Sequence, residues 1–134
     1  MSEHENIKLV KLGYETYRQG DIVALLDWLT DDVDWHVPGP SELPFAGSYQ
    51  GRHEVARFLK IVDETLEFYE FEPREFIAQD NSVAVVGHTR ARVKSTGLIY
   101  EDDWVHVFTL HHDKLLKFRE YYDTAIVVRA FRGD

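Results

Sequence analysis

The sequence contains no cysteine among its 134 residues. This excludes disulfides, cysteine nucleophiles and thiolate metal ligands, and it fits a reducing compartment. No apolar run approaches the roughly 18 residues that a membrane span needs. The opening residues, MSEHENIK, also lack the apolar run of a signal peptide. We therefore expect a cytoplasmic protein with no membrane partner.

Positive charge is scarce as well. Lys and Arg number 15 against 24 Asp and Glu, which gives a net charge of -9. Nucleic acids are recognised through a basic face that neutralises phosphates, so we expect no nucleic-acid partner. The chain length and its 44% of hydrophobic residues predict a single globular domain, residues 1–134, with one hydrophobic core.

The first part of the chain predicts three helices. Ser2 and Glu5 have the spacing of a capping box, and the helix that follows ends at Gly20. Asp21 is placed to cap a second, short helix. Gly51 precedes a third helix, in which apolar residues recur at helical spacing.

One strand and one long loop are expected between the second and third helices. Residues 31–37 alternate polar and apolar side chains, which predicts a strand that ends at Pro38 and points Trp35 inward. Residues 38–50 hold most of the prolines and predict a loop. Because this loop also carries Leu43 and Phe45, we expect it to fold over another part of the molecule.

The second part of the chain alternates with a period of two residues. Four runs, at residues 68–78, 82–94, 98–110 and 114–122, are separated by turn residues and predict four strands in series. Asp123 is placed to cap a short last helix. Helices followed by an antiparallel meander predict an α+β fold in which helices cover one face of a curved sheet.

The last hairpin decides which way its acidic residue faces. A three-residue loop, 111–113, would pair Trp104 with Glu120 and place His106 opposite Phe118. A two-residue turn would shift this register by one. The face with the larger apolar area should point inward. That face carries Asp102, Trp104, His106, Phe118, Glu120 and Tyr122.

A buried carboxylate and imidazole cost several kcal/mol unless they are paired or hydrated. In the predicted register His106 and Glu120 lie diagonally across the hairpin, roughly 7–8 Å apart. One interpretation is an acid–base pair in a cavity lined by aromatic side chains, and the other is a buried structural pair. We predict no metal site, because His111 and His112 lie in a turn without zinc spacing. No phosphate-binding motif is present, and we predict no cofactor.

Three stretches resemble the nuclear transport factor 2-like superfamily in its SnoaL-like branch. They are YRQGDIVALLDWLTDDVDWHVPG, GSYQGRHEVARFL and HVFTLHHDKLLKFREYYDT, and the resemblance covers almost the full chain. It implies a cone-shaped, strongly curved mixed or antiparallel sheet and three N-terminal helices that enclose an apolar pocket. It also implies a homodimer through the outer sheet face. That face would present Arg90, Arg92, Val105, Val107, Arg119 and Tyr121.

Three enzyme groups of this superfamily can be compared residue by residue. In limonene epoxide hydrolases the catalytic acid of the last strand falls on Glu120, but their Arg-x-Asp falls near Gly87 and Thr89, which provide neither charge. The base of the steroid isomerases falls on Val37, which is not an acid. The carboxylate and histidine of SnoaL-type cyclases are most similar to Glu120 and His106.

The sequence therefore predicts a pocket protein that performs acid–base proton transfer, as in an isomerase, cyclase or dehydratase. Its substrate would be a small, apolar, oxygenated molecule, with Glu120 and His106 as the catalytic residues. The expected substrate-binding residues are Trp35, Trp104, Tyr122, Phe118, Asp102, Tyr17 and Phe45. The alternatives are a non-catalytic small-molecule-binding domain and a dimeric structural module.

Overall fold

The computed structural model describes residues 2–134 and confirms the α+β class. The helices are α1 (Glu3–Arg18), α2 (Ile22–Trp28), α3 (Gly51–Thr65) and α4 (Thr124–Arg132). The strands are β1 (Leu29–Val37), β2 (Gly47–Gln50), β3 (Leu66–Gln79), β4 (Ser82–Val93), β5 (Ile99–His111) and β6 (Lys114–Tyr122). Three helices thus precede the long meander, and α4 follows it.

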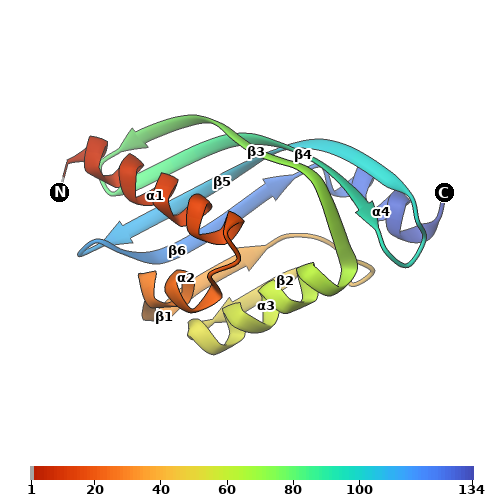
Figure 1. The fold of residues 1–134 in the computed structure, drawn as a ribbon, viewed down its shortest axis with the longest axis horizontal. Helices are drawn as coiled ribbons and strands as arrows, with labels where there is room; N and C mark the ends of the chain where they lie inside the picture. Colours follow the sequence, from red (N-terminus) through yellow and green to blue (C-terminus); the bar gives the residue numbers. More distant parts are fainter. Residues whose placement is uncertain (1) are drawn as a thin grey trace.

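The strands form one mixed sheet in the order β2-β1-β6-β5-β4-β3. β1 runs parallel to β6, and the other neighbouring strands are antiparallel. The strands twist and bend together, so that β3 and β4 arch over one side of the molecule (Figure 1). This curvature gives the sheet a concave face, as expected.

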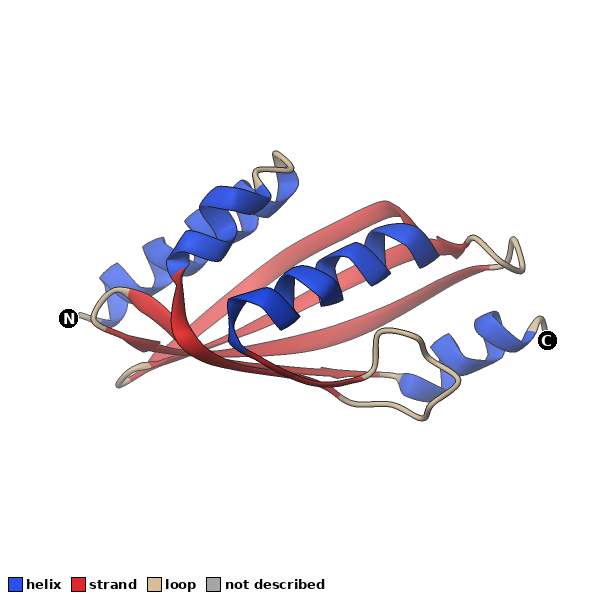
Figure 2. Ribbon diagram, turned by 90° about the horizontal axis from the view of Figure 1, so that it is seen from below, coloured by secondary structure: helices blue, strands red, loops and turns tan. Residues whose placement is uncertain are grey.

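The helices α1, α2 and α3 lie on the concave side of the sheet (Figure 2). α1 contacts β3 and β4, while α3 contacts β1 and β2, so the two helices cover different parts of that face. α4 packs against β5 near the opposite end of the molecule from the start of α1 (Figures 1 and 2). Among residues 2–134, none of the helices has the length and apolar character of a membrane span.

The predicted helix caps are confirmed. The side chain of Ser2 accepts from the backbone N–H of Glu5, and Asp21 and Asp123 cap α2 and α4 in the same way. Gly20 follows α1 with a φ of 74°, a left-handed conformation that glycine adopts without strain. These local signals mark the starts of α1, α2 and α4 and the end of α1.

The stretch expected to be a loop, residues 38–50, is a loop only in part. Its last four residues form β2, which pairs with β1 and places Tyr49 opposite Trp35. The sequence did not reveal this strand, because a four-residue run has too little alternation to stand out from a loop. The remainder folds inward as expected, since Leu43 and Phe45 are buried.

The predicted register of the last hairpin is wrong, although the predicted facing is right. The turn has two residues, His112 and Asp113, with φ values of 49° and 67°. Such a turn moves the register by one residue, but a bulge at residues 115–117 of β6 moves it by one more. The two shifts together restore the parity, so Glu120 still points inward. His106 now lies directly opposite Glu120 rather than diagonally from it.

Candidate functional site

A cavity of about 130 Å3 lies between the concave face of the sheet and the helices. Its walls are mostly aromatic and aliphatic, and its few polar side chains are Thr89, Asp102, His106 and Glu120 along with tyrosine hydroxyls. The structure brings all nine predicted site residues to this one cavity. They are Tyr17, Trp35, Phe45, Asp102, Trp104, His106, Phe118, Glu120 and Tyr122. Their roles in binding or chemistry stay predictions.

Three side chains from three elements form a hydrogen-bonded chain in the cavity wall. The Tyr14 hydroxyl of α1 lies 2.8 Å from Nδ1 of His106 on β5. The other ring nitrogen, Nε2, lies 3.1 Å from Oε2 of Glu120 on β6. Because an ionised carboxylate only accepts hydrogen bonds, we assign the proton of a neutral His106 to Nε2 and let Nδ1 accept from Tyr14.

The direction of this chain determines which atom is left for a ligand. Burial raises the pKa of Tyr14, and the negative charge of Glu120 raises it further, so the hydroxyl keeps its proton and donates. Both ring nitrogens of His106 are occupied. Within the described residues, Oε1 of Glu120 has no hydrogen-bond partner. Among the atoms of Tyr14, His106 and Glu120, it is therefore the one that can act on a ligand.

The imidazole of His106 is held in place by Trp104. The two rings stack with centroids 3.9 Å apart and planes 18° apart. The indole N–H of Trp104 donates to Oγ1 of Thr89 over 2.7 Å, which fixes the rotation of the indole. A Cβ atom at Gly87 would lie only 2.3 Å from the same indole ring. The charged residues of the epoxide hydrolases are thus replaced here by two residues that accommodate Trp104. Gly87 leaves room for the indole ring, and Thr89 accepts its hydrogen bond.

The aromatic walls are continuous around the acid. Trp35 stacks on Phe118 at 3.9 Å between centroids, and Phe118 meets His106 edge-on at 4.9 Å. Tyr122 donates its hydroxyl hydrogen to the carbonyl oxygen of Pro38, which ties the loop before β2 to the end of β6. Phe45 from that loop packs against Phe131 of α4. The loop and α4 therefore close one end of the cavity.

Asp102 is a second buried acid of the cavity. It is only 7% exposed and lies on β5, two residues before Trp104 and on the same face. Burial, and then the negative charge of Glu120, raise the pKa of Asp102 from 3.8 to about 7. A hydrogen bond from the backbone N–H of Asp123 opposes this shift in part. The cavity thus contains two carboxyl groups in different surroundings.

Tyr17 lies one turn after Tyr14 on α1 and borders the cavity near Phe68 and Phe71. Burial raises the pKa of Tyr17 to about 12, with smaller contributions from the charges of Asp63 and Glu120. Its hydroxyl therefore stays protonated at neutral pH. It is available to a ligand because it has no hydrogen-bond partner among residues 2–134.

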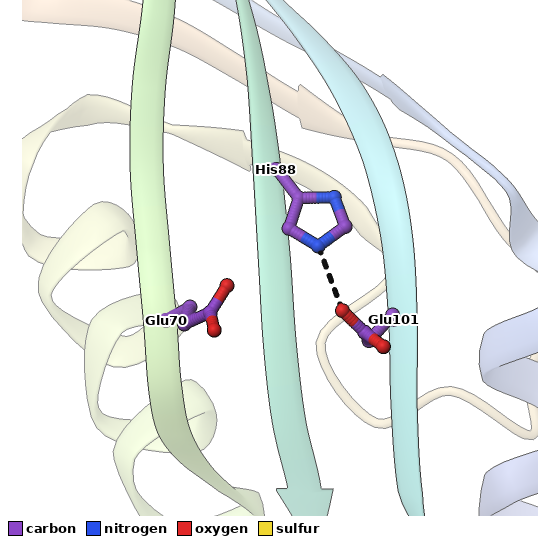
Figure 3. A group of neighbouring side chains, drawn as sticks. All are labelled: Glu70, His88 and Glu101. Atoms are coloured by element: carbon purple, nitrogen blue, oxygen red, sulfur yellow. Dashed lines mark hydrogen bonds and ion pairs between the residues drawn. The ribbon is translucent and has the colours of Figure 1, made fainter.

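A separate polar cluster lies on the opposite face of the sheet. Glu70, His88 and Glu101, from β3, β4 and β5, hold their side-chain donor atoms within 4.8 Å of one another (Figure 3). The ring nitrogens of His88 lie 2.8 Å from Asp103 and 3.0 Å from Glu101. These hydrogen bonds raise the pKa of His88, Asp103 contributing first. A protonated His88 donating to both acids accounts for this geometry.

Tyr14 is the main site residue that sequence reasoning missed. It belongs to the apolar stripe of α1, where an aromatic residue is most simply a core residue. The available signal was its hydroxyl, since a tyrosine buried in a helix face needs a hydrogen-bond partner. Its partner is 92 positions away in the sequence, so periodicity within the helix could not identify it.

The fold agrees with the comparisons to known proteins. The family model of the SnoaL-like domain matches residues 10–118. The chain belongs to this SnoaL-like domain family of the NTF2-like superfamily. No curated protein matches the sequence.

Solved structures give the same result. An NTF2-like protein from Burkholderia xenovorans is 39% identical, with a TM-score of 0.91 over 98% of both chains. An NTF2-like protein of unknown function from Burkholderia pseudomallei is 28% identical, with a TM-score of 0.87 over 98% of both chains. TerC, co-crystallised with polyporic acid, is 26% identical, with a TM-score of 0.83 over 95% of this chain and 98% of its own.

Proposed function

We propose that this protein is an enzyme that moves a proton on a small, largely apolar, oxygenated molecule. The reaction would be of the isomerase, cyclase or dehydratase type. The observation that carries the proposal is the chain from Tyr14 through His106 to Glu120, which ends at a carboxylate oxygen in an aromatic cavity. An acid held in such surroundings can serve as a general base and then return the proton as an acid.

Glu120 is the catalytic residue in this proposal, and His106 acts through it. Oε2 of Glu120 accepts from His106, so the carboxylate is oriented and its other oxygen can face the ligand. Because both of its nitrogens are occupied, His106 does not also donate to a substrate oxygen, and we propose a positioning role for it in place of the catalytic role expected from the sequence. Tyr14 holds Nδ1 of His106 from the other side of the ring and is a positioning residue.

The cavity supports a small organic ligand. Its volume of about 130 Å3 is near the ~150 Å3 of an engineered cavity that binds benzene, so one-ring probes suit a first assay. Flat apolar surface is provided by Trp35, Trp104, Phe118 and Tyr122, and Tyr17 and Phe45 also line the cavity. TerC, with its polyporic acid, supports the search for a small organic ligand.

Isomerisation of cyclohex-3-enone to cyclohex-2-enone, followed by proton NMR, tests the proposal. A base must remove the proton between the carbonyl and the double bond and return it at the far end of that double bond. We expect the wild-type protein to accelerate this reaction. Glu120→Gln should lower the rate by about 100-fold or more, and His106→Ala should lower it nearly as far. Glu101→Gln, an acid on the outer face, should leave the rate unchanged.

The outcome separates the proposal from its main alternative. If the folded wild-type protein binds the enone but does not exceed the Glu120→Gln variant in rate, the protein is better described as a non-catalytic binding domain. That alternative draws on the largely apolar lining of the cavity. Circular dichroism of both variants establishes that any loss of rate occurs in a folded chain.

The setting of this enzyme is part of the same proposal. We propose a one-domain cytoplasmic protein that forms a homodimer through the outer face of its sheet, without cofactor or metal. The absence of cysteine supports a reducing compartment. The half-exposed Tyr121, next to Val105 and Val107 on that face, supports a contact between two copies.

A further inference from the structure

A second pocket lies beside the aromatic cavity, near the ends of α1 and α3. It has a volume of about 310 Å3 and is lined by Tyr17, Asp63, Leu66, Glu67, Phe68, Arg92 and Lys94. Three of these residues, Tyr17, Leu66 and Phe68, also line the cavity that contains Glu120. The two spaces therefore share part of a wall. Four of the seven lining residues of the second pocket are charged, which distinguishes it from the aromatic cavity.

Lys94 is held at this pocket by two hydrogen bonds to the end of α3. Its backbone N–H donates to the carbonyl oxygen of Thr65 over 3.0 Å, and its ammonium group donates to the carbonyl oxygen of Asp63 over 2.8 Å. An ammonium group has three hydrogens, so two remain for a ligand. These contacts hold the exposed side chain at the pocket before a ligand binds, which lowers the entropy cost of binding.

Asp63 provides a free acceptor at the same pocket. Its carboxylate has no hydrogen-bond or ion-pair partner among residues 2–134. Burial raises the pKa of Tyr17 to about 12, and the negative charge of Asp63 adds to this shift. The carboxylate thus acts on the hydroxyl of a residue that borders both spaces. Asp63 and Lys94 together offer an acceptor and a donor beside the shared wall.

The charges of the second pocket are balanced. Glu67 and Arg92 face each other across β3 and β4, where Nε of Arg92 lies 2.9 Å from Oε1 of Glu67. Asp63 and Lys94 add one charge of each sign, so the four charged residues have no net charge. A ligand carboxylate would meet two acids here and an ammonium group two bases, and like charges oppose binding. A hydroxyl group both donates and accepts, so it suits Lys94 and Asp63 together.

We propose that this pocket is a second ligand subsite, which binds the uncharged, hydroxyl-bearing end of an elongated ligand. The apolar ring of the same ligand would lie in the aromatic cavity, and the chain between them would pass the shared wall. Lys94 donates to one hydroxyl oxygen, and Asp63 accepts a hydroxyl hydrogen. This rests on the proposed function and makes its ligand class more specific, namely a ring compound with a side chain that carries neighbouring hydroxyl groups.

Four probes with the same phenoxypropyl skeleton test this subsite. They are 3-phenoxypropane-1,2-diol, propoxybenzene, the anion 3-phenoxypropanoate and the cation 3-phenoxypropylammonium. Their dissociation constants are measured by NMR titration at neutral pH. We expect the wild-type protein to bind the diol at least about fivefold more tightly than either charged probe. Equal or tighter binding of a charged probe would overturn the proposal.

Substitutions assign the preference to the pocket. Lys94→Ala removes the donor and should weaken binding of the diol by about fivefold, while the affinity for propoxybenzene changes by less than about twofold. Asp63→Asn removes a negative charge and should strengthen binding of 3-phenoxypropanoate by about fivefold. Lys114→Ala is the control, because the ammonium group of Lys114 also donates to a distant backbone carbonyl, that of Asp27, but lines neither space. Diol affinity that is the same in Lys94→Ala and Lys114→Ala would contradict the subsite.

The subsite and the proposed function can fail separately. Cyclohex-3-enone is a ring without a side chain, so its isomerisation reports on the cavity alone. If the wild type isomerises it but shows no Lys94-dependent preference for the diol, the subsite fails and the proposed function stands. If the preference is found and cyclohex-3-enone is not isomerised, the proposed function fails and the pocket stands as part of a binding domain. Circular dichroism spectra that match the wild type show that the variants are folded.

Discussion

At the scale of single residues, the site depends on hydrogen bonds with a defined direction. Tyr14 donates to His106 and His106 donates to Glu120, so each residue limits what the next can do. Burial strengthens this order, because a group that loses its partner inside the protein has no water to replace it. The acid can be oriented only while the two residues behind it keep their partners.

Tyr14→Phe tests this order. The change leaves Nδ1 of His106 buried without a donor, which should lower the free energy of unfolding by about 1–3 kcal/mol in urea titrations. The kcat for cyclohex-3-enone should fall by about tenfold with little change in KM, because the ligand does not contact Tyr14 in our proposal.

Tyr17→Phe is the matched control for this prediction. Tyr17 lies on the same helix and faces the same cavity, but its hydroxyl has no partner among the described residues. Its stability change should stay below about 0.5 kcal/mol. Equal losses of unfolding free energy in Tyr14→Phe and Tyr17→Phe would mean that the effect does not come from the hydrogen bond to His106.

The sequence predicted that Glu120 points inward, but not that Tyr14 holds His106 behind it. Glu120 and His106 could be placed inward because the large side chains of their strands share one parity, and burial of that area selects the face. Tyr14 could not be placed, since its partner lies on another element. The sequence indicates that Gly87 and Thr89 lack the charges of the epoxide hydrolases. Their contacts with Trp104 could not be predicted, because they depend on the cross-strand pairing of β4 and β5.

At the scale of elements, the hairpin of β5 and β6 shows how two irregularities can cancel. A two-residue turn alone would turn Glu120 outward, and the bulge at residues 115–117 turns it back. Neither feature is marked by a glycine. In the turn, His112 and Asp113 adopt the left-handed conformation instead, and the bulge consists of Leu115, Leu116 and Lys117. Parity could therefore be predicted from burial, while the exact partner of each residue could not.

Gly87 on β4 provides an element-level prediction. A methyl group there would meet the Trp104 ring at 2.3 Å and the carbonyl oxygen of Glu72 at 2.7 Å. We expect Gly87→Ala to lower the free energy of unfolding by about 1–3 kcal/mol and to move Trp104 away from His106. Urea unfolding and tryptophan fluorescence measure the two effects. An unchanged unfolding midpoint together with an unchanged spectrum would contradict this packing role.

At the scale of the whole molecule, the curved sheet has two faces that carry different side chains. The concave face, with three helices over it, contains the cavity. The outer face combines charged residues such as Arg90 and Arg119 with the exposed ring of Tyr121. The order of elements and the resemblance to a known superfamily were enough to predict the concave side. No pattern within one chain states what contacts the outer side.

The homodimer through this outer face is therefore the prediction that needs a direct measurement. We expect sedimentation equilibrium to give twice the mass of the chain, and Tyr121→Asp to shift it towards one chain mass. A buried carboxylate without a partner would oppose contact between the two apolar patches. Leu12→Asp is the control, because Leu12 is as exposed as Tyr121 but lies on α1. A wild-type monomer, or a dimer that dissociates with Leu12→Asp and not with Tyr121→Asp, contradicts this interface.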